Sequence, residues 1–145
     1  MTVSSQTEEL KTKGRNDCVD ITEAVQRAVT HAKIRQGLAT VFVTGSTAGI
    51  STTEYEPGLV NHDLAASFEG IAPENGSYVH EQTWHDDNGH AHVRATLLGP
   101  SLTVPIVDGR LTLGTWQQII LIDFDTRPRR REVIVQIMGL AHKSS

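Results

Sequence analysis

Apolar side chains recur at intervals of three and four residues in two stretches of the chain, which is the spacing of a helix that packs one face on a core. The first apolar stripe is formed by Ile21, Ala24, Val25, Ala28, Val29 and Ala32. Asp20 can cap this helix, Glu23 stands three residues later as in a capping box, and Gly37 marks the end. The second stripe predicts a helix over 58–69 with Gly70 as its C-cap.

The other apolar stretches are short and rich in branched and aromatic residues, as is typical of strands. The predicted strands cover residues 3–13, 17–21, 38–43, 50–55, 91–98, 102–107, 115–124 and 130–138. Asp108 and Gly109 give a hairpin signal between two of them. The polar residues 73–90 predict a long loop, and residues 143–145 predict a loose tail.

The order of these elements predicts an α+β fold. Strands, a helix, strands, a second helix and a final run of strands indicate an antiparallel sheet or sandwich with two main helices on one face. No repeat, low-complexity tract or long linker interrupts the sequence, so residues 1–145 are expected to form a single domain.

Composition and charge narrow the class of protein. Hydrophobic residues make up 38% of the 145 positions and charged residues 21%, which excludes disorder, collagen-like repeats and coiled coils. The formal net charge is −4 and no basic face with interleaved aromatic residues is present, so a nucleic-acid partner is not expected. The arginines between 127 and 131 are interpreted as a solvated turn. The absence of a membrane-length apolar run and of a secretory pattern, together with the lone Cys18, predicts a cytoplasmic protein without a membrane partner.

The candidate chemistry is concentrated in one segment. Four of the seven histidines lie between residues 80 and 92, namely His80, His85, His90 and His92. Imidazole is the side chain best suited to bind a metal or carry a proton near neutral pH. If a strand begins at His90, the side chains of His90 and His92 point to one face and, with His80, can hold a divalent metal such as Zn²⁺ or Mg²⁺. A metal-free catalytic pocket and a solvated loop with incidental histidines are the alternatives.

Carboxylates, a small turn and a tryptophan are further candidates for a functional site. In place of His80, a carboxylate from Asp86, Asp87, Glu54 or Asp63 can complete the histidine site. Glu54 and Asp63 can also orient an imidazole or act as a base. The turn at 45–49 can bind an anion through its backbone amides, or simply connect two strands. Trp116 can pack in the core or stack on a flat heterocycle.

Residues 101–119 carry the most specific motif of the chain. They read SLTVPIVDGRLTLGTWQQI, with a Gly-Thr-Trp-Gln block near the end, and His92 upstream is followed by a predicted strand and Leu-Gly. Further motifs are Ser46-Thr47-Ala48, Glu54, His62-Asp63 and Tyr78-Val79-His80. Together these motifs resemble those of the YjbQ family, over about residues 3–139.

The resemblance implies a homotrimer with a YjbQ-like α+β fold and a weak thiamine-phosphate synthase activity. In that transferase reaction a thiamine pyrimidine diphosphate joins a thiazole phosphate and pyrophosphate leaves, so a small phosphorylated metabolite is the expected ligand. The catalytic residues that it implies are His80, His92, Glu54 and Asp63. The substrate-binding residues that it implies are Ser46, Thr47, Arg94, Gly114, Thr115, Trp116 and Gln117.

The chain departs from the family pattern at a turn and at Thr53-Glu54-Tyr55, where many relatives have Asn-Glu-Asn. Many relatives begin this turn with His-Thr, where the chain has Gly45-Ser46-Thr47. We interpret His90 as a replacement for the missing histidine. Two rival functions are a non-catalytic trimer that binds a metal or a metabolite, and a metal-assisted hydrolase in which histidines and carboxylates activate water.

Overall fold

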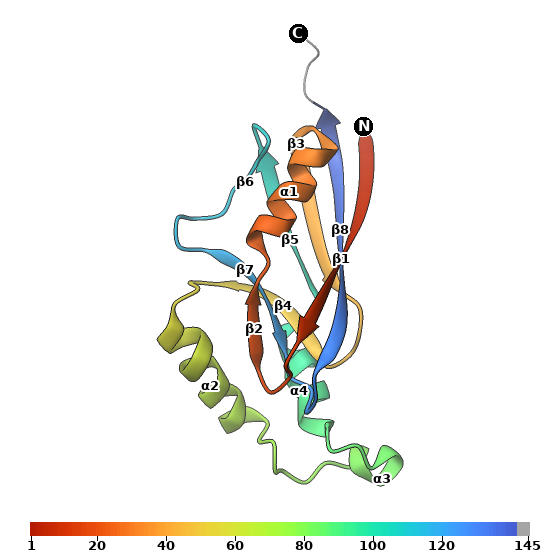
Figure 1. Ribbon diagram of the computed structural model, residues 1–145, viewed down its shortest axis with the longest axis vertical. Helices are drawn as coiled ribbons and strands as arrows, with labels where there is room; N and C mark the ends of the chain where they lie inside the picture. The colour runs from red at the N-terminus through yellow and green to blue at the C-terminus, as the bar shows by residue number, and fades with distance from the viewer. Residues whose placement is uncertain (142–145) are drawn as a thin grey trace.

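Two antiparallel sheets form the framework of the protein (Figure 1). The computed structural model describes residues 1–141, so the tail predicted at 143–145 lies outside the described residues. The strands are β1 (Thr2–Thr12), β2 (Asp17–Asp20), β3 (Ile34–Val43), β4 (Ala48–Thr53), β5 (Ser101–Val107), β6 (Arg110–Leu111), β7 (Gln118–Asp123) and β8 (Arg129–Ala141). The larger sheet has the order β1-β8-β3-β5-β6, and the smaller sheet has the order β2-β7-β4.

Helix α1 (Thr22–Ala32) covers the inner face of the larger sheet (Figure 1). Its residues Val25 and Val29 are fully buried, and they belong to one core cluster with Val41 of β3 and Val135 of β8. The apolar stripe predicted for this helix is therefore confirmed, and its burial drives the helix onto the sheet. The predicted α+β class with antiparallel sheets is confirmed as well.

Helix α1 ends earlier than the sequence suggested. Its last residue is Ala32, because Lys33 adopts a left-handed conformation (φ 57°) and the chain then enters β3 directly. Gly37, the expected end of the helix, instead lies inside β3 opposite Gly139. A Cβ atom on Gly37 would lie 2.1 Å from the carbonyl oxygen of Met138, so this glycine serves the close approach of two strands.

The second helical segment begins as a wider turn. It runs through η1 (Leu59–Asp63) into α2 (Leu64–Ile71). The two carboxylate oxygens of Glu56 accept hydrogen bonds, both at 2.8 Å, from the N–H groups of Gly58 and the residue after it, which fixes the start of the segment. The helix includes Gly70, which was expected to follow its end, so the predicted boundary is displaced by two residues.

Residues 91–98 were expected to form a strand and instead form most of helix α4 (Gly89–Leu98). Ala91 and Ala95, four residues apart, face a second core cluster that includes Phe124. The short apolar run fits both a strand and a helix, and packing on this cluster decides in favour of the helix.

The long loop predicted before α4 contains a further short helix, α3 (His80–Trp84). Figure 1 shows α3 and α4 at the end of the molecule opposite the N-terminus and the end of β8. Within the described part of the chain, every helix is too short or too polar to span a bilayer.

Candidate functional site

A histidine and two carboxylates converge where α3 meets the residues that follow it. The Nδ1 atom of His80 lies 3.4 Å from Oδ1 of Asp86 and 3.9 Å from Oε1 of Glu81. This Nδ1 atom is shielded from solvent and has no hydrogen-bond partner among the described residues. The three side chains each offer one ligand atom, and these atoms lie within 4.8 Å of one another, which makes them a candidate set for a metal ion.

The residues that start α4 hold the two carboxylates in place. The backbone N–H of Gly89 donates to Oε1 of Glu81 at 2.8 Å, and the side-chain amide of Asn88, oriented with its nitrogen toward Asp86, donates to Oδ1 of Asp86 at 2.8 Å. Gly89 also permits the close approach of α3, because a Cβ atom there would lie 2.6 Å from Cβ of Tyr78. Donors of this kind orient metal ligands.

His92 lies next to this cluster on α4. Its ring centroid is 4.6 Å from that of His80, with the two planes inclined by 47°. Its Nδ1 atom lies 3.1 Å from the carbonyl oxygen of Ser46. Because a carbonyl oxygen can only accept a hydrogen bond, Nδ1 carries the proton and the neutral ring has its lone pair on Nε2. His92 therefore offers a proton acceptor beside His80.

His90 lies apart from this pair, contrary to the expectation of a shared face. Two residues on a strand point to the same side, but on a helix they are about 200° apart around the axis. His90 is only 2% exposed, and its ring centroid is 6.4 Å from that of Tyr78. Burial and the charge of Arg94 lower the pKa of His90, which disfavours its charged form. The predicted metal set of His80, His90 and His92 is therefore not assembled, and His90 does not take the place of the turn histidine.

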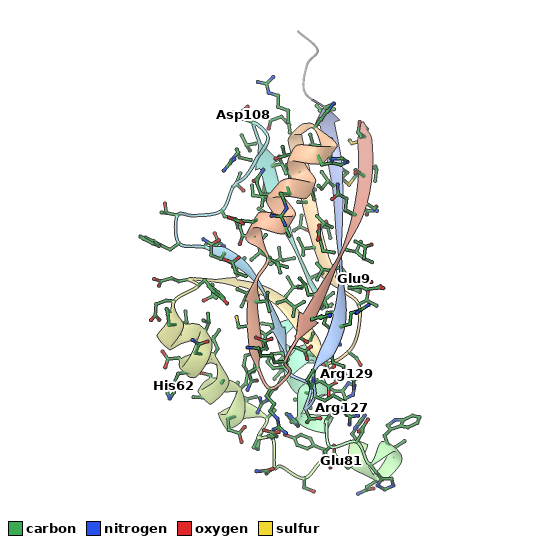
Figure 2. All side chains as sticks on the ribbon, viewed as in Figure 1. Glu9, His62, Glu81, Asp108, Arg127 and Arg129 are labelled. Carbon is green, nitrogen blue, oxygen red and sulfur yellow. The ribbon has the colours of Figure 1, made fainter. Side chains whose placement is uncertain are left out.

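A cavity of about 690 Å³ opens beside the metal-ligand cluster. Glu81 and Asp86 belong to both the cluster and the cavity wall. The remaining lining residues are Arg15, Glu74, Asn75, Gly76, Asp87, Thr126 and Arg127. Figure 2 shows Arg127 and Glu81 at the same end of the molecule. Acidic side chains outnumber basic ones in this wall, so the cavity favours a cation.

Arg94 was expected to contact a phosphate, but its side chain is buried and directed at other segments of the protein. It is 2% exposed. Its guanidinium group donates to the carbonyl oxygen of Ala72 at 2.9 Å, to Oδ1 of Asn16 at 2.8 Å and to Oε2 of Glu69 at 2.8 Å. Arg94 thus joins α4 to distant segments of the chain, and its donors are directed at protein groups.

In the turn predicted to bind substrate, residues 45–49, the side chains of Ser46 and Thr47 have different surroundings. Ser46 meets the site through its backbone, since its carbonyl oxygen accepts the hydrogen bond from His92. Thr47 is 5% exposed, and its hydroxyl group donates to Asp125 at 2.9 Å and accepts from Arg131 at 2.6 Å. Thr47 therefore lies behind the turn and is directed away from any ligand.

The Gly-Thr-Trp-Gln block forms an exposed turn at residues 114–117. The N–H of its last residue donates to the carbonyl oxygen of its first at 3.0 Å, and β7 begins only after it. Trp116 is 74% exposed, so it does not pack in the core. Together with Glu54 and Tyr55 it lines a second surface cleft, which shares no lining residue with the cavity beside the metal-ligand cluster.

Asp63 is the remaining predicted site residue. Its carboxylate lies 3.0 Å from Nδ1 of its neighbour His62, and both side chains are exposed. Figure 2 places His62 on the helix across the molecule from Glu81. The structure thus brings together His80 and His92 from the predicted set, and leaves Glu54 and Asp63 outside the cluster.

Comparison with known proteins identifies the family. A family model described as UPF0047 protein YjbQ-like matches residues 6–140. The chain belongs to the YjbQ family. A UPF0047 protein of Methanocaldococcus jannaschii is 37% identical over 131 residues, which cover 90% of this chain and 91% of that protein. A UPF0047 protein of Archaeoglobus fulgidus is 40% identical over 129 residues, or 89% and 97% of the two chains.

Solved structures share the fold of this YjbQ-family chain. A YbjQ-like protein of unknown function from Sulfolobus solfataricus P2 matches with a TM-score of 0.85 and 32% identity, covering 96% of this chain and 100% of that one. A hypothetical protein from Aeropyrum pernix K1 matches with a TM-score of 0.88 and 31% identity, covering 94% and 99%. The family resemblance drawn from the motifs is confirmed, whereas the activity, the metal and the trimer stay predictions.

Sequence reasoning missed Glu81, Asn88 and Gly89 in this YjbQ protein. The pair Asn88-Gly89 was read as a turn inside a loop, but asparagine also commonly precedes the first turn of a helix. Recognising it as a helix start would have placed His92 inside α4. Glu81 directly follows His80, and only the short helix α3 turns both side chains toward Asp86.

Proposed function

We propose that this YjbQ-family protein is an enzyme that uses a divalent cation and acts on a phosphorylated small molecule. One observation carries the proposal: Nδ1 of His80 is shielded, has no hydrogen-bond partner, and faces carboxylate oxygens of Asp86 and Glu81 at 3.4 and 3.9 Å. Leaving a buried polar atom unpaired costs about 1–3 kcal/mol, and a bound cation would relieve that cost.

His80, Glu81 and Asp86 would hold the cation. One imidazole nitrogen with two carboxylate oxygens suits Zn²⁺ better than Mg²⁺, which prefers oxygen ligands and bound water. When bound, the cation supplies positive charge that stabilises the charge developing on phosphate oxygens or on a departing diphosphate. Asn88 and Gly89 keep the carboxylates aligned for this role.

His92 would carry a proton in the reaction. Its Nδ1–H is anchored on the carbonyl oxygen of Ser46, and Nε2, which has no hydrogen bond to any described residue, can accept a proton. A base that is oriented by a further hydrogen bond is the usual arrangement for proton transfer in enzymes. The attacking thiazole nitrogen has no proton to give, so His92 would take its proton from solvent, and the Nε2–H formed would donate it to the departing pyrophosphate.

The cavity supports a ligand that enters together with a cation. Its four carboxylates outnumber its two guanidinium groups, so an anion alone would be repelled. With a divalent cation bound, the charges balance, and Arg15 and Arg127 can contact phosphate oxygens. The reaction to test first is the one that the resemblance implies, the joining of a thiamine pyrimidine diphosphate to a thiazole phosphate. We further propose that the protein works as a homotrimer.

His80→Ala should abolish cation binding. Protein freed of metal by a chelator is titrated with Zn²⁺ by calorimetry, and His80→Ala should bind more than about a hundredfold more weakly than the wild type. His62→Ala is the matched control, since it removes an exposed imidazole outside the cluster. A wild type that binds no cation, or equal binding by the two variants, would contradict the site.

The same proteins test the reaction. Loaded with cation, the wild type should release pyrophosphate from the two thiamine precursors, and His92→Ala should lose roughly 10²–10⁴-fold in rate while it retains the cation. Cation binding without turnover would favour the non-catalytic metal- or metabolite-binding function. Release of inorganic phosphate from a simple phosphate ester would favour the metal-assisted hydrolase.

A further inference from the structure

The turn that anchors His92 has a buried ionic network behind it. Asp123 and Asp125 are 0% and 1% exposed, and Arg131 is 7% exposed. Arg131 donates through Nε and Nη2 to the two carboxylate oxygens of Asp123, at 2.7 and 2.9 Å. Charges that are buried in this way depend on every partner, because a charge left unpaired in the interior is strongly unfavourable.

Thr47 connects this network to the turn. Nη2 of Arg131 donates to Oγ1 of Thr47 at 2.6 Å, and the hydroxyl group donates onward to Asp125 at 2.9 Å. The carbonyl oxygen of Thr47 accepts the N–H of Phe124 at 2.9 Å. Thr47 is therefore fixed by three hydrogen bonds, and Ser46 is the residue immediately before it.

Gly45 precedes Ser46 and allows the turn to approach the guanidinium group of Arg131 closely. Its φ of +121° lies in the region that favours glycine, and a Cβ atom there would lie 2.8 Å from Nη1 of Arg131. That guanidinium group is held by three hydrogen bonds and cannot easily yield. Arg131 therefore leaves little room for a side chain at position 45.

We propose that Thr47 and Arg131 are positioning residues that set the tautomer and the ring orientation of His92 through the carbonyl group of Ser46. The importance of this for catalysis rests on the proposed function of His92 as a proton carrier. Among the described hydrogen bonds, none runs from Thr47 or Arg131 to the cation ligands, so the effect should be confined to His92.

The tautomer of a neutral histidine follows the partners of its two ring nitrogens. With the carbonyl of Ser46 in place, the Nδ1–H form of His92 gains a hydrogen bond, which favours that form by about fivefold. A displaced carbonyl would remove the preference, and the proton would reside on Nε2 for part of the time. That fraction of the molecules could not accept a proton at Nε2.

Nitrogen-15 NMR of the His92 ring tests the proposal, at a pH well above the ordinary histidine pKa. The wild type should show a protonated Nδ1. Thr47→Val removes the hydroxyl group at nearly constant size and should move the tautomer ratio about fivefold toward Nε2–H, and Thr47→Ser should restore the wild-type ratio. Thr12→Val is the matched control, because Thr12 also donates to Asp123 but makes no hydrogen bond to the turn.

An unchanged His92 tautomer in Thr47→Val, or an equal shift in Thr12→Val, would overturn the proposal. If Thr47→Val does not fold, Gly45→Ala presses on the same guanidinium group and should produce the same shift. Zn²⁺ titration separates the two hypotheses, since Thr47→Val should keep its affinity within about twofold of the wild type. A wild type that binds no cation would refute the proposed function, while the tautomer would still decide the role of Thr47.

Discussion

Four histidines that are close in sequence have four different surroundings, and these surroundings determine what each ring can do. His80 has an unpaired nitrogen facing carboxylates, and His92 has one nitrogen anchored and the other free. His90 is buried, and burial lowers its pKa. His85 adopts a left-handed conformation (φ 56°) and ends α3. Clustering along the chain is therefore a weak guide to function until the local structure is known.

We expect His90 to make the protein less stable in mild acid. Burial, followed by the charge of Arg94, lowers the pKa of His90 in the folded protein below its ordinary 6.5. The unfolded chain therefore takes up this proton first as the pH falls. The contribution of His90 to the free energy of unfolding should be constant above pH 6.5 and should fall below it, by up to about 1.4 kcal/mol per pH unit, until the folded pKa is reached.

Urea unfolding at a series of pH values measures this contribution. In His90→Gln the part of the slope that begins near the ordinary histidine pKa should be missing, because the unfolded and folded chains no longer differ in that proton. His62→Gln controls for the loss of a histidine, since His62 is exposed. Identical slopes for the wild type and His90→Gln would show that the buried ring does not govern the acid sensitivity.

At the scale of elements, the sequence correctly predicted those features that depend on a local pattern of residues. The stripe of α1 and the hairpin at Asp108-Gly109, whose φ angles are 51° and 78°, were both correctly read. The boundary at Gly37 and the strand at 91–98 were not. Gly37 is needed for the close approach of β3 to β8, and residues 91–98 form a helix because they pack on the second core cluster. Both features therefore depend on contacts between residues distant in sequence.

The candidate site was only half predictable for the same reason. His80 and His92 were identified, but their helices are α3 and α4, and the first has only five residues. A helix of that length is not stable alone, so its existence depends on contacts such as that of Glu81 with Gly89. No pattern within 73–90 could indicate those contacts.

Gly89→Ala should therefore weaken both the site and the fold. A Cβ atom there would lie 2.6 Å from Cβ of Tyr78 and 3.0 Å from Oε1 of Glu81, so α3 must move away from α4. We expect Zn²⁺ affinity to fall by at least about tenfold, and the free energy of unfolding to fall by about 1–3 kcal/mol. Calorimetric titration and urea unfolding give the two quantities.

Gly70→Ala is the control for this substitution. It makes the same change near the end of helix α2, where a Cβ atom would meet nothing within 4 Å. It should raise the free energy of unfolding by up to about 1 kcal/mol and leave Zn²⁺ affinity unchanged. Unaltered cation binding by Gly89→Ala would argue that the junction of α3 and α4 does not hold the ligands.

At the scale of the whole molecule, the site occupies one end and leaves the broad sheet free. Figure 1 shows α3 beyond the lower end of both sheets, whereas α4 packs on the smaller sheet and α1 covers only the inner face of the larger one. The outer face of that sheet carries an apolar row across four strands. The row consists of Val3, Met138, Leu38 and Pro105, which are paired in register. Val3, Met138 and Leu38 are 59%, 42% and 44% exposed, and an apolar row of this kind is typical of an interface.

Leu38→Glu should therefore dissociate the proposed homotrimer. A second copy packed on the outer face would bury the new carboxylate without a partner, which costs several kcal/mol. Light scattering at several concentrations should find a trimer for the wild type and a monomer with unchanged circular dichroism for the variant.

Leu97→Glu is the control, because Leu97 is an apolar residue of α4 with 60% exposure. We place the contact on the sheet because its row continues over four paired strands, so that one partner surface can cover it at once. A monomeric wild type would exclude self-association, and dissociation by Leu97→Glu alone would move the interface to α4.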